Sequence, residues 1–67
     1  MTIQEFKKLA KRNSKLIYSV RTHKNEYFEG YIIEYAHIYN PNNVSPQNSV
    51  TYDGTLSSIL EKYFTIL

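Results

Sequence analysis

The chain has 67 residues, no cysteine, 42% apolar residues and a formal net charge of +2. This composition argues against a disulfide framework, a thiolate metal site, a disordered chain, a signal peptide and a membrane span, so we expect one globular domain over residues 1–67 in the cytoplasm. The small net charge hides an asymmetry, because residues 1–25 carry seven of the eight basic residues and only one of the six acids.

A short amphipathic helix is predicted over residues 3–12. Thr2 and Glu5 have the spacing of a capping box, in which each residue satisfies a backbone amide of the other. One apolar stripe follows at helical spacing, formed by Ile3, Phe6, Leu9 and Ala10. Basic side chains fall on the opposite side, namely Lys8, Lys11, Arg12 and Lys15.

The pattern then changes to the alternation that is typical of strands. We predict a first strand over residues 16–24 and a second over residues 27–39. The second run is long and apolar, so we expect a bend or a close approach of another backbone at Gly30. A polar loop over residues 40–49 leads to a short strand over residues 49–53.

The C-terminal tail fits two structures. Leu56, Ile59 and Tyr63 have helical spacing, whereas the residues that follow resemble a strand, which we place over residues 61–66. The favoured fold class is mainly β, with the N-terminal helix followed by a small, strongly bent, five-stranded SH3-like barrel. The alternative is an α+β fold with a C-terminal helix.

Residues 28–40 resemble the first sequence motif of Sm and Sm-like proteins. That motif has a glycine, a hydrophobic residue, an aromatic residue and a final asparagine, and these places are held by Gly30, Ile32, Tyr35 and Asn40. Ile3-Gln4-Glu5 is similar to the start of the bacterial Sm-like RNA chaperones, the Hfq family. The resemblance implies an Sm-like barrel, a hexameric or heptameric ring of identical subunits, and single-stranded A-rich or U-rich RNA as ligand.

The chain departs from the family pattern at four positions. One is Ile38, at or beside which the family has an aromatic residue that stacks on a base, although Tyr39 is adjacent. Ala36 replaces the acid of an aromatic-acidic pair. Asp53 and Gly54 follow Tyr52, where the family has the lysine and histidine of its uridine pocket. A relative with these changes would keep the fold and lose the uridine pocket.

The candidate RNA-binding residues fall into two groups. Cations along one helix attract phosphates and release counterions on binding, and the candidates are Lys8, Lys11, Arg12 and Lys15. The resemblance places the second group near the pore of the ring, namely Gln4, His37, Tyr39 and Asn40. The plainer interpretation is a solvated helix face for the cations and a turn position for Asn40.

The favoured function is that of an RNA-binding Sm-like protein, an RNA chaperone or post-transcriptional regulator acting as a ring. The alternative belongs to another class: a small protein-binding accessory or inhibitor module from a phage or plasmid that uses a tyrosine-rich face. No glycine-rich phosphate loop is present, and the two histidines lack a partner at metal-ligand spacing. We therefore expect no enzyme activity, metal or cofactor.

Overall fold

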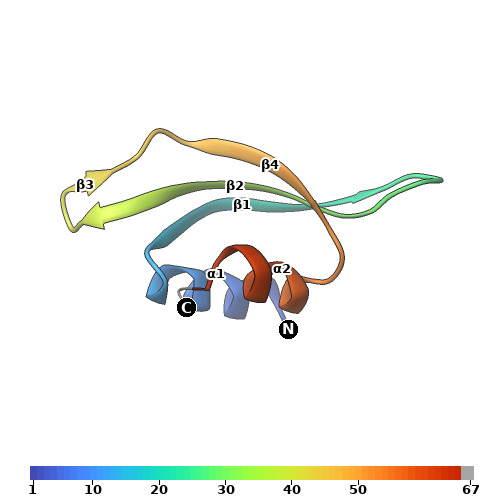
Figure 1. The fold of residues 1–67 in the computed structure, drawn as a ribbon, viewed down its shortest axis with the longest axis horizontal. Coiled ribbons are helices and arrows are strands. Elements are labelled where there is room, and N and C mark those ends of the chain that lie inside the picture. Colours follow the sequence, from blue (N-terminus) through green and yellow to red (C-terminus); the bar gives the residue numbers. More distant parts are fainter. Residues whose placement is uncertain (66–67) are drawn as a thin grey trace.

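The chain forms two layers, with two helices on one face of an antiparallel sheet (Figure 1). The computed structural model describes residues 1–65. Its elements follow in the order α1 (Ile3–Arg12), β1 (Lys15–Lys24), β2 (Glu29–Asn40), β3 (Asn43–Val44), β4 (Asn48–Asp53) and α2 (Leu56–Tyr63). The mainly β class with an N-terminal helix is confirmed. None of the described helices is long and apolar enough to cross a membrane.

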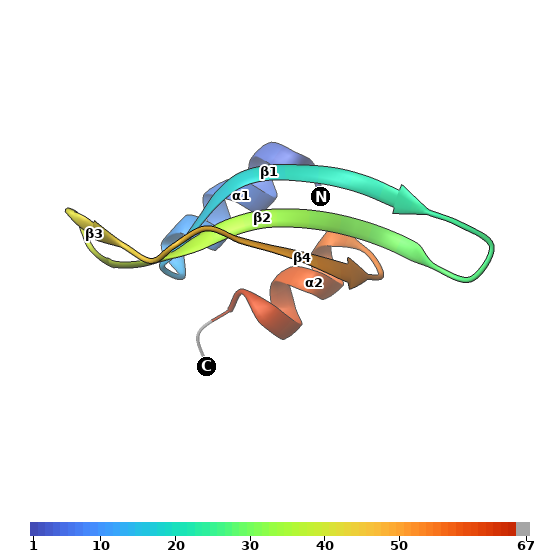
Figure 2. The ribbon, with the colours of Figure 1, turned by 90° about the horizontal axis from the view of Figure 1, so that it is seen from above.

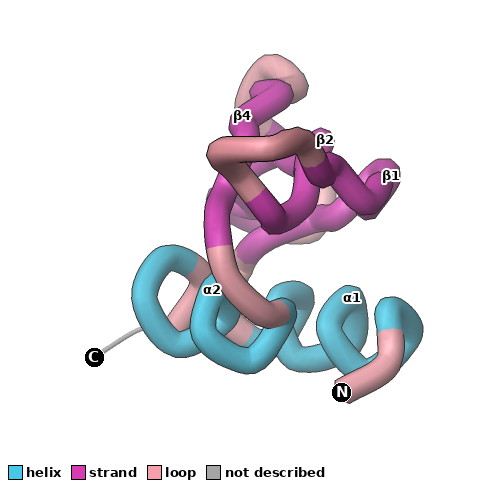
Figure 3. Tube along the Cα trace, turned by 90° about the vertical axis from the view of Figure 1, so that its right-hand side faces the viewer, coloured by secondary structure: helices cyan, strands magenta, loops and turns pink. Residues whose placement is uncertain are grey.

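The sheet is built around β2, which pairs with β1 on one side and with β4 on the other. Figure 2 shows these three strands side by side, with α1 behind β1 and α2 on the β4 side. The two-residue strand β3 pairs with the end of β2. It lies inside the segment predicted as a loop over residues 40–49. Within residues 1–65 the sheet has four strands and does not close, so the five-stranded barrel is not confirmed (Figure 3).

Local signals at both ends explain why α1 forms where it does. The Thr2 side chain accepts a hydrogen bond from the Glu5 amide at 3.1 Å, as the capping box predicts. Phe6 and Ala10 are fully buried beneath the sheet. The helix ends at Arg12, and Ser14 then adopts a positive φ of 61°, which turns the chain into β1. The helix predicted over residues 3–12 is confirmed.

The strand predicted over residues 61–66 is wrong for the residues that the structure describes. Residues 61–63 belong to α2, and residue 66 lies outside the described part of the chain. Gly54 has a φ of 99°, and the Thr55 side chain then caps α2 by accepting from the Ser58 amide at 3.2 Å. The C-terminal helix of the alternative fold is therefore present.

The core lies between the sheet and the two helices. Its buried side chains come from both layers: Phe6, Ala10, Ile17, Ile33, Tyr52, Leu56, Ile59 and Phe64. Phe64, just after α2, makes edge-to-face ring contacts with Phe6 at 5.5 Å and Tyr35 at 4.9 Å. These contacts explain the helical tail, because they place Phe64 beneath the sheet and not along its edge.

At Gly30 the backbone of β2 lies very close to that of β4. A Cβ atom at this position would overlap the carbonyl oxygen of Tyr52. The predicted close approach at Gly30 is confirmed, and only glycine fits there without moving β4.

Candidate nucleic-acid interface

A row of rings runs along β2 to its end. Tyr35, His37 and Tyr39 occupy alternate positions, so they share one face of the strand. The rings of Tyr35 and His37 lie edge to face at 5.6 Å, and those of His37 and Tyr39 stack at 6.5 Å with an interplanar angle of 23°. Tyr39 is 67% exposed. The row thus begins against the core and ends in an aromatic surface open to solvent.

His37, in the middle of this row, is fixed by side-chain and backbone contacts. Lys15 lies opposite it on β1, and the Lys15 Nζ atom is 2.8 Å from His37 Nδ1. An ammonium group only donates, so Nδ1 accepts and the ring proton is assigned to Nε2. The His37 amide donates to Ser45 Oγ at 2.8 Å, and the Ser45 amide donates to the His37 carbonyl at 2.8 Å.

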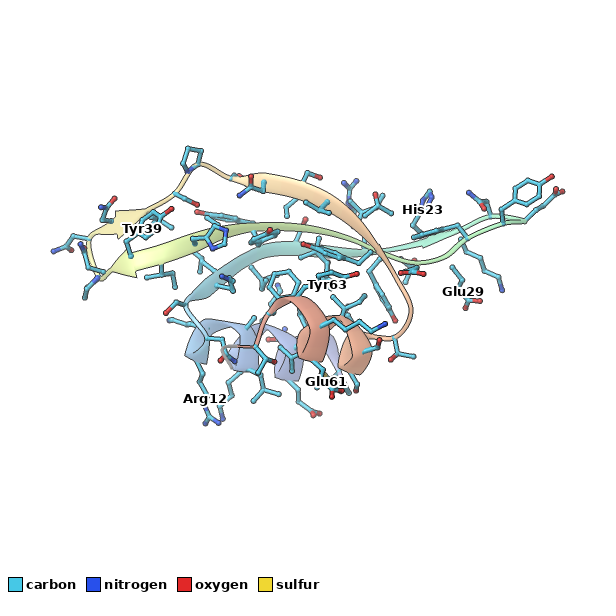
Figure 4. All side chains as sticks on the ribbon, in the orientation of Figure 1. Arg12, His23, Glu29, Tyr39, Glu61 and Tyr63 are labelled. Atoms are coloured by element: carbon cyan, nitrogen blue, oxygen red, sulfur yellow. The ribbon has the colours of Figure 1, made fainter. Side chains whose placement is uncertain are left out.

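The last turn of α1 lies at the same end of the sheet. Lys8, Lys11 and Arg12 are exposed, and Lys11 and Arg12 form the last turn of the helix. Figure 4 shows Arg12 below, and Tyr39 above, at the same end of the molecule. In residues 1–65 the one ion pair joins Arg21 and Glu34 at 3.3 Å, so the cations of α1 have no carboxylate partner in that part of the chain.

Other candidates line a groove between α1 and the start of β1. Gln4, Lys8 and Lys11 lie beside it, over an apolar floor formed by Leu16 and Ile17, and the groove has a volume of about 330 Å³. Lys7 also lines it and was missed by the sequence analysis. The signal was available, because positions 4, 7, 8 and 11 fall on one helical face. The eight predicted residues therefore form two groups. The groove group is Gln4, Lys8 and Lys11. The sheet-end group consists of the other five, namely Arg12, Lys15, His37, Tyr39 and Asn40.

Asn40, by contrast, stabilises a turn. Its Oδ1 atom accepts a hydrogen bond from the Asn42 amide at 2.9 Å, which closes the turn between β2 and β3. The plainer interpretation of Asn40 as a turn residue is confirmed. The residue is exposed and follows Tyr39 as the last residue of β2.

Family models, curated proteins and solved structures gave no match to this chain. The resemblance to Sm-like proteins therefore depends on the residues that carry it. Asp53, which departs from the family pattern, pairs with Gly30, and this places it at the opposite end of β2 from Tyr39. Asp53 and Gly54 are thus remote from the sheet-end group. The described residues contain no cluster of His, Asp and Glu that could hold a metal ion.

The tyrosines of β2 do not form one exposed face. Tyr31 and Tyr35 are half-buried and pack against the core, whereas Tyr39 is exposed. Tyr27 lies apart from them, in the turn between β1 and β2, and is 93% exposed. Glu34, which lies between Tyr31 and Tyr35 in the sequence of β2, accepts hydrogen bonds from Arg21 and Gln47. Most of the tyrosine-rich strand therefore serves the core.

Proposed function

We propose that the protein binds single-stranded RNA at the end of the sheet. A base would stack on the exposed face of Tyr39, and the phosphates of the RNA backbone would contact Lys15 and the cations of α1. The observation that carries the proposal is the stacked pair of His37 and Tyr39 with the ammonium group of Lys15 at its edge. Stacking on an aromatic side chain contributes about 1–3 kcal/mol per base and tolerates any sequence.

The distribution of charge supports the same ligand. Lys7, Lys8, Lys11, Arg12 and Lys15 belong to α1 and the start of β1. One acid, Glu5, lies in the first turn of α1. Others lie elsewhere: Glu29 is at the far end of the sheet in Figure 4, and Asp53 is paired opposite its neighbour Gly30. A polyanion approaching the last turn of α1 therefore meets cations that form no ion pair within residues 1–65, and it gains entropy from released counterions.

The resemblance to Sm-like RNA chaperones favours the same ligand class and extends the proposal to a role in post-transcriptional regulation. It also implies a ring of identical subunits. A ring requires two different edges of each subunit, here β1 and β4, to pair with neighbours. The mass of the protein in solution tests the ring separately from RNA binding.

The test is binding of short A-rich and U-rich RNA, measured by fluorescence anisotropy at several salt concentrations. One variant carries Lys8→Gln, Lys11→Gln and Arg12→Gln on α1. Its matched control carries Arg21→Gln, Lys24→Gln and Lys62→Gln, which remove the same charge from other elements. We expect the α1 variant to bind weakly, with a salt slope flattened by about 2, because each phosphate contact on a single strand contributes about 0.7.

Two results contradict the proposal. If the wild-type protein binds neither RNA, the site does not bind single strands. If the control variant loses as much affinity as the α1 variant, net charge alone attracts the RNA, and the sheet-end site has no special part in it.

A further inference from the structure

The two edges of the open sheet differ in how well they are protected against pairing with another chain. The β1 edge carries Lys15, Arg21 and Lys24, and a bulge breaks its register between Ile17 and Ser19. Charged residues and bulges are the usual means by which proteins prevent edge pairing. The β4 edge, over Asn48–Asp53, has no lysine, arginine or proline and runs in unbroken register with β2. Of the two edges, β4 is the open one.

The unpaired backbone groups of β4 form a symmetrical set. The Gly54 amide donates to the Glu29 carbonyl on β2 at 3.1 Å. Backbone groups of alternate residues point to the same side of a strand, so even-numbered positions bond to β2. The amides and carbonyls of Ser49, Thr51 and Asp53 therefore point away from the sheet. These three residues are spaced evenly about Thr51.

Apolar side chains flank the same edge on the side of the helices. Val50 lies opposite the buried Ile33, which places it on the helix-facing side, and it is 37% exposed. Tyr63 of α2 is 52% exposed and its ring lies 4.7 Å from that of Tyr52 (Figure 4). The core thus continues to the β4 edge and ends there in partly exposed apolar surface.

We propose that β4 pairs in antiparallel fashion with β4 of a second copy, about a two-fold axis at Thr51. In this register Ser49 lies opposite Asp53 of the partner subunit, and Val50 lies opposite Tyr52 of the partner subunit. Every outward amide and carbonyl of the three residues finds a partner, and no two like charges face each other. A chain this short buries a thin core, so joining two cores across the edge adds stability. The inference does not rest on RNA binding, and it replaces the ring that the family resemblance implies, because the free edge of β4 pairs with only one neighbour.

The first test is the mass of the protein in solution, measured by light scattering and sedimentation over a range of concentrations. We expect a dimer that Val50→Lys converts to a monomer, because the added ammonium groups meet the partner's apolar edge. The matched control is Tyr18→Lys, since Tyr18 lies in the β1 bulge and is 48% exposed. This control stays dimeric if only β4 pairs. A ring uses both edges, so both Val50→Lys and Tyr18→Lys would disrupt a ring.

A second variant distinguishes loss of the β4 pairing from loss of the fold. Thr51→Pro removes an outward amide and leaves the bonds between β4 and β2 in place, as proline at an edge strand allows. Circular dichroism should stay unchanged while the mass halves. In the wild-type protein, hydrogen exchange at Ser49, Thr51 and Asp53 should slow as concentration rises. A monomer at every concentration, a hexamer or heptamer, or fast exchange at these three amides in the assembled protein would overturn the proposal.

Discussion

The ammonium group of Lys15, the first residue of β1, lies 2.8 Å from the Nδ1 atom of His37 on β2. The turn after α1 is tied to the same place, because the Ser14 carbonyl accepts a hydrogen bond from the Ile38 amide at 2.9 Å. The end of α1, the start of β1 and the end of β2 are therefore held together by contacts one residue apart. A strand of RNA would meet the cations and the aromatic row in one fixed arrangement.

Replacing Lys15 with methionine tests this arrangement. Lys15→Met keeps the length of the side chain and removes the donor to His37, so we expect RNA affinity to fall about tenfold, which corresponds to about 1.4 kcal/mol. Nitrogen NMR should show the wild-type His37 ring with its proton on Nε2. Lys24→Met, at the far end of β1, is the control and should bind RNA like the wild-type protein. A ring proton on Nδ1 in the wild-type protein would contradict the contact.

Tyr39 should carry the stacking part of RNA binding. Tyr39→Ala removes the exposed ring and should cost about 1–3 kcal/mol of binding free energy, whereas Tyr39→Phe keeps the ring and should bind nearly as well. The control is Tyr27→Ala, which removes another exposed tyrosine from the turn between β1 and β2. Isothermal titration with the same RNA measures all three variants. Equal losses for Tyr39→Ala and Tyr39→Phe would mean that the hydroxyl group, and not stacking, makes the contact.

The N-terminal helix was predictable because every signal for it is local. Thr2 and Glu5 define the cap, and Phe6 and Ala10 form the buried stripe, all within ten residues of chain. The alternation over residues 16–24 likewise depends on near neighbours. For the tail, local patterns conflict, and the contacts of Phe64 with Phe6 and Tyr35 decide in favour of the helix. Such contacts join residues far apart in the sequence, which local periodicity does not report.

In the candidate site, too, local spacing was predictive and contacts between distant segments were not. Alternate spacing within one strand predicts that His37 and Tyr39 share a face, as they do. The contact between Lys15 and His37 depends on the register of β1 against β2, including the bulge at Tyr18, and no pattern in either strand specifies it. Closure of the sheet likewise depends on pairing between distant strands, which local alternation does not report, and the five-stranded barrel that we favoured from the sequence is not confirmed.

Gly30 should tolerate no side chain. In Gly30→Ala the new Cβ overlaps the Tyr52 carbonyl, so β4 must move away from β2, and we expect a loss of about 2–3 kcal/mol in the free energy of unfolding. Gly54→Ala is the comparison, because its Cβ has room and only its φ of 99° is unfavourable, which costs about 1–2 kcal/mol. Urea unfolding of both variants measures the difference. A smaller loss for Gly30→Ala than for Gly54→Ala would contradict the close approach.

Stability should fall in alkaline solution because of Tyr52. Burial raises the pKa of the Tyr52 phenol above its usual value, and the hydrogen bond with Tyr35 and the charges of Tyr35 and Tyr63 raise it further. The unfolded chain ionises near pH 10 while the folded chain holds the proton, so the stabilisation is complete below about pH 10 and is lost as the pH rises above it. Urea unfolding between about pH 8 and about pH 11 measures this. Tyr52→Phe should flatten the dependence, whereas Tyr27→Phe, at an exposed position, should leave it as steep as in the wild-type protein. Equal slopes for Tyr52→Phe and the wild-type protein would show that another group causes the alkaline loss.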